Sequence, residues 1–261
     1  MHGPRRAFPR FGRGRVGPEP RSVQITTERL APGMYVLFGE GGNIGLAVGP
    51  DAVFVVDDQF APLTPKILAA IATITDKPVR FLVNTHWHFD HSGGNENMAK
   101  AGALPVVTFN DVLTFHLNGG EITAIHLAAA HTDGDAAIYF RGPNVVHMGD
   151  VYVRYGFPFI GLSSGGSLSG MITAVDMMFG IINDSTKIIP GHGKVANRAN
   201  LRAYRDVLAT IHERVRKQAA AGASLDRIIA SKPTREFDAT WAGFIKADDF
   251  VRFAYAGVPH R

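Results

Sequence analysis

Three imidazoles and one carboxylate fall within six residues of one segment, 85–94. His86 and His88 are two residues apart, so both can point the same way and share one metal ion. Asp90 and His91 are neighbours that point differently, and they could serve a second metal beside the first. Imidazole nitrogen and carboxylate oxygen are zinc-ligand atoms. The alternative, unrelated histidines on a solvated loop, explains this density poorly, and we predict a metal site.

The segment follows an apolar run, 79–83, that is typical of a buried strand. A side chain on the loop after such a strand can be aimed into a cleft by a rigid scaffold. Acidic or imidazole side chains follow apolar strand candidates at four further places: Asp57, His131, Asp150 and His192. Each of these alone has an ordinary interpretation as a turn former, a helix cap or a core residue. Together they favour one site at one edge of a sheet.

Apolar periodicity and turn residues predict the elements that position these groups. Strands are expected at 34–38, 43–48, 52–56, 79–83, 104–109, 112–117, 121–129, 136–140, 144–148 and 187–189. Helices are expected at 63–75, 96–100, 168–182, 200–220, 225–231 and 240–255. Strands followed by a helix occur twice, with helices at the close. Two sheets packed together with helices outside would bury the apolar faces, so we predict an α/β fold of the four-layer αββα type.

The positive charge is concentrated at the start of the chain. The formal net charge is +4, but residues 1–21 hold six Arg and one Glu, which leaves −1 for the rest. This Arg-, Gly- and Pro-rich stretch predicts a disordered basic tail without the apolar core of an export signal. We expect residues 22–261 to form one domain that carries the metal site and has a helical C-terminal end. Cellular location and oligomeric state stay open.

The body of the chain indicates a small-molecule substrate. Its near-neutral charge argues against nucleic acid, which needs a basic footprint. No apolar run approaches the length of a membrane span. The chain has no cysteine, so a metal site must use His and carboxylate ligands. That set suits zinc, and iron or manganese is not excluded.

The ordered motifs resemble those of the metallo-β-lactamase superfamily over roughly residues 30–195. They are Asp57 after a strand, His-x-His-x-Asp-His at 86–91, His131, Asp150 in Met-Gly-Asp, and His192 in Pro-Gly-His-Gly. The resemblance implies the αββα fold and two Zn²⁺ per chain. It assigns His86, His88 and His131 to the first ion, Asp90, His91 and His192 to the second, and Asp150 to a bridge between them. It makes Asp57 an orienting residue behind the ligands.

The resemblance also implies a mechanism and a reaction. Two zinc ions lower the pKa of a bridging water, and the resulting hydroxide attacks a carbonyl or phosphorus. Asp90 would hold the hydroxide and pass a proton to the leaving group. We predict hydrolysis of a cyclic amide or ester, with β-lactam hydrolysis as the specific prediction. Alternatives are a lactonase, thioesterase or phosphodiesterase of the same superfamily, or a metal-stabilised binding module without turnover.

Three departures from the β-lactamases limit the transfer. Asp150 stands where zinc β-lactamases carry Cys or Ser, which resembles the other hydrolases of the superfamily. Val153 occupies the place nearest to their basic, substrate-binding residue, and Arg154 is the only neighbouring candidate for that role. The segment 100–107 is short, so a strand and loop are expected to be missing, which opens one side of the cleft or leaves an unpaired edge.

Two aromatic features are also informative. We expect Trp87 to pack beneath the metal-binding loop rather than to bind substrate. The segment 157–162 is either an apolar wall for the substrate or a packed connection.

Overall fold

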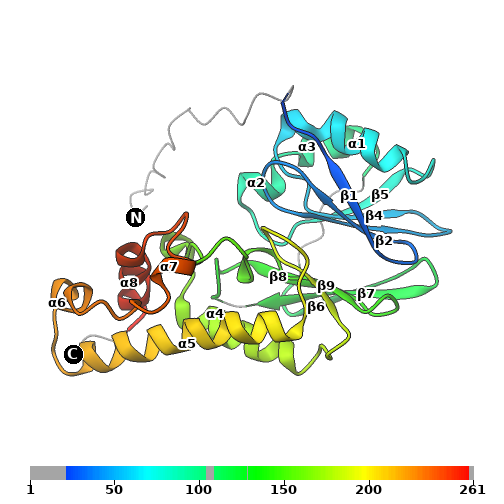
Figure 1. Ribbon diagram of the computed structural model, residues 1–261. Helices are drawn as coiled ribbons and strands as arrows, with labels where there is room; N and C mark the ends of the chain where they lie inside the picture. Colours follow the sequence, from blue (N-terminus) through cyan, green and yellow to red (C-terminus); the bar gives the residue numbers. More distant parts are fainter. Residues whose placement is uncertain (1–21, 104–108, 128, 259–261) are drawn as a thin grey trace, which may run out of the picture.

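The computed structural model describes residues 22–103, 109–127 and 129–258 (Figure 1). Its strands are β1 (Thr26–Ala31), β2 (Met34–Phe38), β3 (Ile44–Val48), β4 (Val53–Val56), β5 (Val79–Val83), β6 (Val112–Leu117), β7 (Gly120–Leu127), β8 (Asp135–Phe140), β9 (Val145–His147) and β10 (Lys187–Ile189). Its α-helices are α1 (Thr64–Ala72), α2 (Phe89–Ser92), α3 (Asn95–Lys100), α4 (Leu168–Phe179), α5 (Arg198–Ala220), α6 (Leu225–Ala230), α7 (Asp238–Trp241) and α8 (Ala247–Ala256). Short 3₁₀ turns are η1 (Ala61–Leu63), η2 (Gly149–Val151) and η3 (Leu162–Ser164).

The strands form two five-stranded sheets that face each other (Figure 1). The first has the order β1-β2-β3-β4-β5, and the second has the order β10-β9-β8-β7-β6. Each sheet is antiparallel except at one pair, β4 with β5 and β10 with β9. In both parallel pairs the strand ends that lead into polar segments come to lie side by side.

Strand β4 shows why these sequences fold as two-sided strands. Its side chains alternate, because successive residues of a strand point to opposite faces. Val53 and Val55 join the cluster on the helix side of the sheet, whereas Phe54 and Val56 join the cluster between the sheets. All four are buried. A short run that is apolar throughout is therefore required here, since neither face of the strand meets water.

Three apolar layers separate the four structural layers. The first sheet packs α1 and α3 on its outer face, through side chains such as Ile67 and Met98. The inner layer joins the two sheets, and the third layer joins the second sheet to α4, α5 and α8. The predicted αββα sandwich is confirmed. No helix in the described part of the chain is long and apolar enough to cross a bilayer.

The structure corrects the prediction of a single helix over 240–255. The chain instead forms α7 and α8, joined by a segment around Ala242 that has a non-helical ψ of 75°. The carbonyl of Trp241 accepts a hydrogen bond from the amide of Phe157, 2.9 Å away in another segment. This tertiary bond, together with Gly243, turns the chain out of the helix. Ile245 is thereby buried and Phe244 is exposed.

Other differences concern the edges of the sheets. Strand β1 was not predicted, because its sequence is mostly polar and exposed, as an edge strand allows. The predicted tail at 1–21 and most of the predicted strand at 104–109 lie outside the described residues. Within the described ranges β5 pairs with β4 alone, so it is the second edge of its sheet. Whether the shortened segment leaves that edge open stays a prediction.

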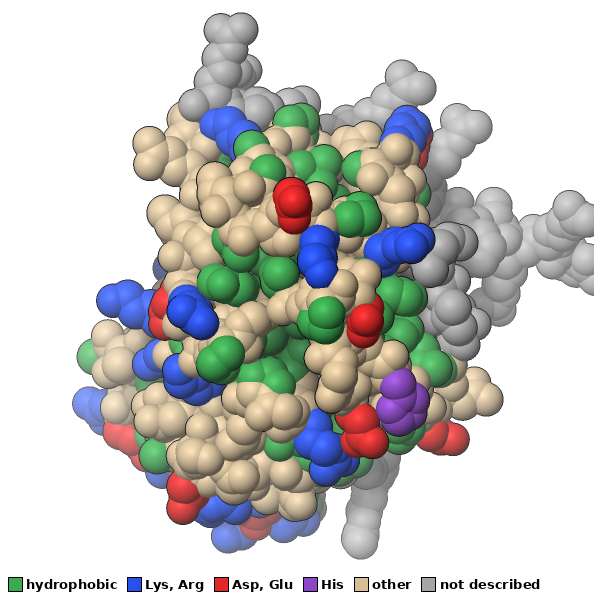
Figure 2. Space-filling model, turned by 90° about the vertical axis from the view of Figure 1, so that its right-hand side faces the viewer, with side chains coloured by type: hydrophobic (Ala, Val, Ile, Leu, Met, Phe, Trp, Pro, Cys, Tyr) green, Lys and Arg blue, Asp and Glu red, His purple; other side chains and the backbone are tan. Residues whose placement is uncertain are grey.

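The end of the sandwich that lies away from α2 carries mixed charge. Figure 2 shows this end, where Lys and Arg side chains alternate with Asp and Glu among small apolar areas. No field of a single sign covers the described surface in this view. Binding of duplex nucleic acid rests on a continuous basic footprint. This face offers none.

Phe54 holds the two sheets together, and its truncation tests the sandwich. It is fully buried and contacts Phe81, Phe115 and Phe140 with ring centroids 6.0, 5.1 and 6.1 Å away. We expect Phe54→Ala to lower the free energy of unfolding by about 3–5 kcal/mol in urea titrations, because it leaves a cavity. The exposed Ile181→Ala should change it by less than about 0.5 kcal/mol. A small effect at Phe54 would contradict this packing.

Candidate metal centre

The candidate ligands and the orienting residue Asp57 all follow strands, at the end of the sandwich where α2 lies (Figure 1). Their positions are Asp57 after β4, His86 and His88 after β5, Asp90 and His91 in α2, His131 after β7, Asp150 in η2 after β9, and His192 after β10. The structure thus brings the predicted site residues from both sheets together. It also replaces part of the predicted loop by the single turn of α2, which turns His91 inward to full burial.

Three imidazoles form a first group. His88 Nδ1 lies 3.1 Å from His86 Nε2 and 3.0 Å from His131 Nε2. His131 Nδ1 lies 2.8 Å from the carbonyl of Phe159, to which it can only donate. That bond fixes the tautomer and leaves the Nε2 lone pair facing the other two rings. Lone pairs that converge on one point repel one another, and a bound cation would remove that repulsion.

A carboxylate and two imidazoles form a second group. His192 Nε2 lies 3.3 Å from His91 Nε2 and 3.2 Å from Asp90 Oδ2. His91 is fully buried, whereas the Asp90 side chain is 32% exposed and that of His192 is 22% exposed. This group therefore has a buried base and an accessible side.

Asp150 lies between the two groups. Its Oδ1 is 3.3 Å from His91 Nε2 and 3.4 Å from His192 Nε2, and its Oδ2 is 3.7 Å from His131 Nε2. Oδ1 is buried, and it has no hydrogen-bond partner within the described part of the chain. A Cβ on Gly191 would lie 1.9 Å from this oxygen, so only glycine fits there. A buried, unpartnered anionic oxygen among imidazole nitrogens fits a divalent cation.

The protonation states agree with that fit. Burial, together with the neighbouring His91, holds the pKa of His86 well below its usual range, so its ring is neutral. Burial alone would raise the pKa of Asp150, but the His192 and His91 imidazoles hold it well below its usual range. Burial opposes charge on His192 too, yet Asp150 and Asp90 raise the pKa of His192 to about 9. A cation would compete with that proton, so binding should release protons.

The carboxylate of Asp57 orients the buried part of the site. Its Oδ1 accepts a hydrogen bond from the Thr85 amide at 2.7 Å, and its Oδ2 accepts one from the Thr85 hydroxyl at 2.8 Å. His91 Nδ1 lies 2.8 Å from the same Oδ2. The His91 ring is thereby turned so that its Nε2 faces Asp150. Asp57 has a φ of +64°, a conformation that Asp tolerates better than most residues.

Comparison with known proteins finds a matching family model and solved structures of the same fold. A family model described as the metallo-beta-lactamase superfamily matches residues 37–125. No curated protein matches the chain. A metallo-β-lactamase from Pontibacter korlensis is 17% identical and has a TM-score of 0.62 over 71% of this chain and 99% of that one. One from Hirschia baltica is 19% identical, with a TM-score of 0.61 over 71% and 98%. The resemblance to the metallo-β-lactamase superfamily is confirmed.

A stereoselective inverting sec-alkylsulfatase from Pseudomonas sp. shares the same fold and more of the chain. It is 14% identical, with a TM-score of 0.71 over 88% of this chain and 50% of that one, so the chain spans half of its length. The aligned part covers 88% of this chain, which is more than residues 1–224 alone would supply. It therefore includes some residues of the C-terminal helices beyond residue 224. Proteins of the metallo-β-lactamase superfamily are mostly hydrolases and typically bind divalent metal, and the His and Asp groups here could hold one.

The sequence reasoning missed the loop that packs against the second group. A Cβ on Gly42 would lie 2.2 Å from the His91 ring. Two hydrogen bonds hold Gly42 there. Its amide donates to the Asp90 carbonyl at 2.9 Å, and its carbonyl accepts a hydrogen bond from Gln59 Nε2 at 2.7 Å. Asn43 Nδ2 donates to the carbonyls on either side of the His192 loop, at 190 and 193, both at 2.8 Å. The signal available in the sequence was Gly41-Gly42-Asn43, because glycine permits a close approach of the backbone.

The aromatic predictions had mixed outcomes. Trp87 is 52% exposed, with its ring 4.7 Å from that of His88, so the prediction that it packs beneath the loop is wrong. A Cβ on Gly93 or Gly94 would already lie 3.0 Å or less from residues 58–59, which leaves no room there for a large ring. The segment 157–162 combines both alternatives. Phe157 and Ile160 are buried, whereas Phe159 and Leu162 are exposed.

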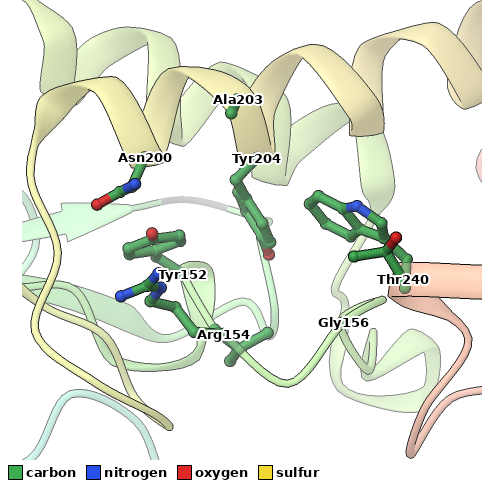
Figure 3. Close-up of a pocket in the computed structure, with 9 residues that line it drawn as sticks. Tyr152, Arg154, Gly156, Asn200, Ala203, Tyr204 and Thr240 are labelled. Carbon is green, nitrogen blue, oxygen red and sulfur yellow. The ribbon is translucent and has the colours of Figure 1, made fainter. Parts of the chain in front are cut away.

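The side chain of Arg154 makes its hydrogen bonds outside the two ligand groups, although its amide donates to the carbonyl of His192 at 3.0 Å. Its Nη1 donates to the carbonyls of Lys194 and Val195, at 3.2 and 3.1 Å. Its side chain lines a cavity of about 260 Å³ together with Tyr152, Tyr204 and Trp241 (Figure 3). None of the candidate metal ligands lines this cavity. The placement lends no support to a substrate contact, which stays a prediction.

Replacing the orienting carboxylate should weaken metal binding. We expect Asp57→Asn to lower metal affinity by about 10–100-fold, because His91 loses the acceptor that fixes its ring. Competition with a chromogenic chelator measures this change. Asp184→Asn, at an exposed carboxylate, is the matched control and should have no effect. Equal affinities in the two variants would contradict the orienting role.

Asp58 should make stability depend on pH. Burial, and in addition the nearby Asp57 carboxylate, raises the pKa of Asp58 to about 8, although the Gly94 amide donates to it. The unfolded value is about 4. Stability from this group is therefore complete below about pH 4 and is lost as pH rises to about 8.

The variant Asp58→Asn lacks this titration. The free energy of unfolding of the variant minus that of the unmodified protein should increase by up to about 1.4 kcal/mol for each pH unit between about pH 4 and 8. Above about pH 8 this difference should stay constant. Urea titrations at several pH values measure the difference. A difference that does not vary with pH would show that Asp58 is ionised in the fold.

Proposed function

We propose that the protein is a zinc-dependent hydrolase with a dinuclear site that cleaves a cyclic amide or ester, with β-lactam hydrolysis as the specific reaction. One observation carries the proposal. Three overlapping sets of ligand atoms, with the atoms of each set within 4.8 Å of one another, join the two groups through buried His86, His91 and Asp150, and the second group has an accessible side. A purely structural zinc site is closed by protein ligands, whereas a catalytic site keeps a position open.

The ligands are proposed to divide as the resemblance implies. His86, His88 and His131 would hold one ion, and Asp90, His91 and His192 would hold the other. Asp150 would contact both, since its two oxygens face different groups. When bound, the two ions would lower the pKa of water and polarise the bond to be cleaved.

Asp90 is the group proposed to move the proton. Burial favours its neutral form, but the hydrogen bond from His192 lowers its pKa below the usual value. It is therefore ionised near neutral pH and able to accept a proton. Its exposure places it at the accessible side, where a leaving group would depart. A positioned carboxylate of this kind contributes about 10²–10⁴-fold in rate.

A second candidate reaction is the hydrolysis of an alkyl sulfate ester. The observation that favours it is the alkylsulfatase match, which extends into the C-terminal helices and has the higher TM-score. The C-terminal part of the chain places Phe244, between α7 and α8, and Phe253 of α8 near the candidate centre. Asp150, in place of the Cys or Ser of zinc β-lactamases, is also compatible with lactone, thioester or phosphodiester substrates.

The first experiment is cephalosporin hydrolysis by the zinc-loaded protein and by Asp90→Asn. We expect turnover that falls by about 10²–10⁴-fold in the variant, because the proton acceptor is lost. Glu96→Gln, at an exposed carboxylate on the neighbouring helix, is the matched control and should keep full activity. Chelation by EDTA should abolish turnover, and zinc should restore it.

The same assay on a γ-lactone, a thioester, a phosphodiester and a secondary alkyl sulfate assigns the substrate. Activity on one of these in place of the cephalosporin would replace β-lactam as the substrate and keep the hydrolase. A metal-loaded protein inert toward all of them would favour a metal-stabilised binding module. Iron or manganese in protein purified without added metal would overturn the assignment of zinc.

A further inference from the structure

Exposed apolar side chains gather around the candidate centre. Eight large hydrophobic side chains are exposed among the described residues, and five of them lie on the segments that surround the site: Trp87, Phe89, Phe159, Leu162 and Phe244. Phe244 is 73% exposed and Phe89 is 75% exposed. A contiguous exposed apolar patch on a soluble domain marks a binding surface.

Four aromatic rings form what we call the aromatic rim: Trp87, Tyr155, Phe159 and Phe244. On one side of the centre, the Phe159 ring lies 5.9 Å from that of His131, and the Trp87 ring lies 4.7 Å from that of His88.

On the other side, the Tyr155 ring lies 5.7 Å from that of His192, and Phe244 packs against Tyr155 at 5.6 Å. The aromatic rim therefore contacts imidazoles of both ligand groups.

The aromatic rim is held in place by the second half of the chain. Phe253 of α8 packs edge-on against Phe159, with centroids 5.5 Å apart. The Phe159 amide donates to the Tyr155 hydroxyl at 3.4 Å, and its carbonyl faces His131 Nδ1 at 2.8 Å. The position of Phe159 is thus coupled to a candidate ligand on one side and to α8 on the other. A surface fixed in this way binds without first paying the entropy of ordering its side chains.

Two described cations near the aromatic rim, Lys246 and Arg154, donate to backbone carbonyls. Lys246 follows Phe244 by two residues, and its Nζ donates to the Gly243 carbonyl at 2.9 Å. Arg154 precedes Tyr155, and its guanidinium donates to the carbonyls after His192. Among the described residues, the carboxylates of Asp90 and Asp150 lie within ion-pair distance of histidines alone. The surface beside the centre therefore suits an uncharged group.

We propose that the aromatic rim binds an uncharged apolar group, an alkyl chain or an aromatic ring, that the substrate carries next to the bond to be cleaved. This inference rests on the proposed function for its location and deepens it by naming the substrate class. The occupant is part of the substrate because the rings touch the candidate ligands themselves. Apolar walls with a few convergent polar groups are the usual composition of small-molecule sites.

A series of 4-nitrophenyl esters tests the proposal through rates. The acetate, butyrate and octanoate differ in apolar length alone. We expect kcat/KM to rise with chain length, by up to about fourfold for each methylene that the rim buries. Phe159→Ala and Phe244→Ala should flatten this rise, with the largest loss, about tenfold, for the octanoate. Ile181→Ala, at an exposed apolar residue away from the centre, should leave the whole series unchanged.

A binding measurement makes the test independent of turnover. The chain has two tryptophans, so in Trp241→Phe the fluorescence reports on Trp87 alone. Octanamide, which is uncharged, should cause a saturable change in that fluorescence. Its Kd should rise about tenfold in Phe244→Ala, a highly exposed position whose truncation does not endanger folding. Octanoate and octylammonium should bind more weakly than octanamide.

The two experiments separate the proposals. Saturable octanamide binding that the rim variants weaken, with no turnover of the esters, the cephalosporin or the other substrates named above, would keep the rim and overturn the hydrolase. Turnover without dependence on chain length, and without octanamide binding, would overturn the rim and keep the hydrolase. Binding to phosphatidylcholine vesicles that is lost in Phe244→Ala, with no octanamide binding, would assign the surface to a membrane and overturn the substrate proposal.

Discussion

The buried carboxylate of Asp57 is the constraint on which the candidate centre depends. It follows β4 and holds the residues after β5 through both oxygens, by way of the Thr85 amide and hydroxyl and the ring of His91. One side chain thus joins a strand end, the next strand end and α2. Burying a carboxylate is costly unless hydrogen bonds compensate for the lost water. Satisfying Asp57 therefore sets the orientation of His91 at the base of the centre.

The rest of the centre exists only because two sheets pack face to face. The first sheet brings His86 to His91, and the second brings His131, Asp150 and His192. The apolar layer around Phe54 fixes the distance between them. Nitrogen atoms from different sheets consequently approach within 3.0–3.3 Å, as between His88 and His131 or His91 and His192. The packing of the core between the sheets therefore also sets the geometry of the site.

The C-terminal helices connect this shared scaffold to the choice of substrate. Phe253 of α8 supports Phe159, and Phe244 between α7 and α8 packs on Tyr155. The ligand side of the centre is thus built by the strand ends, and its apolar side by the second half of the chain. Reaction type and substrate preference can vary separately in such an arrangement, because different elements carry them.

The sequence alone determined the layers of the sandwich, most strand limits and the set of polar residues at the strand ends. Apolar periodicity and strand-end chemistry are local patterns, so they are legible without coordinates. Tertiary structure alone decided the break between α7 and α8, the exposure of Trp87 and the placing of Gly42 and Asn43 against the ligands. These depend on contacts between residues far apart in the chain, such as the bond from the Phe157 amide to the Trp241 carbonyl. No local pattern encodes such a contact, because its energy arises only once the sheets and helices have packed.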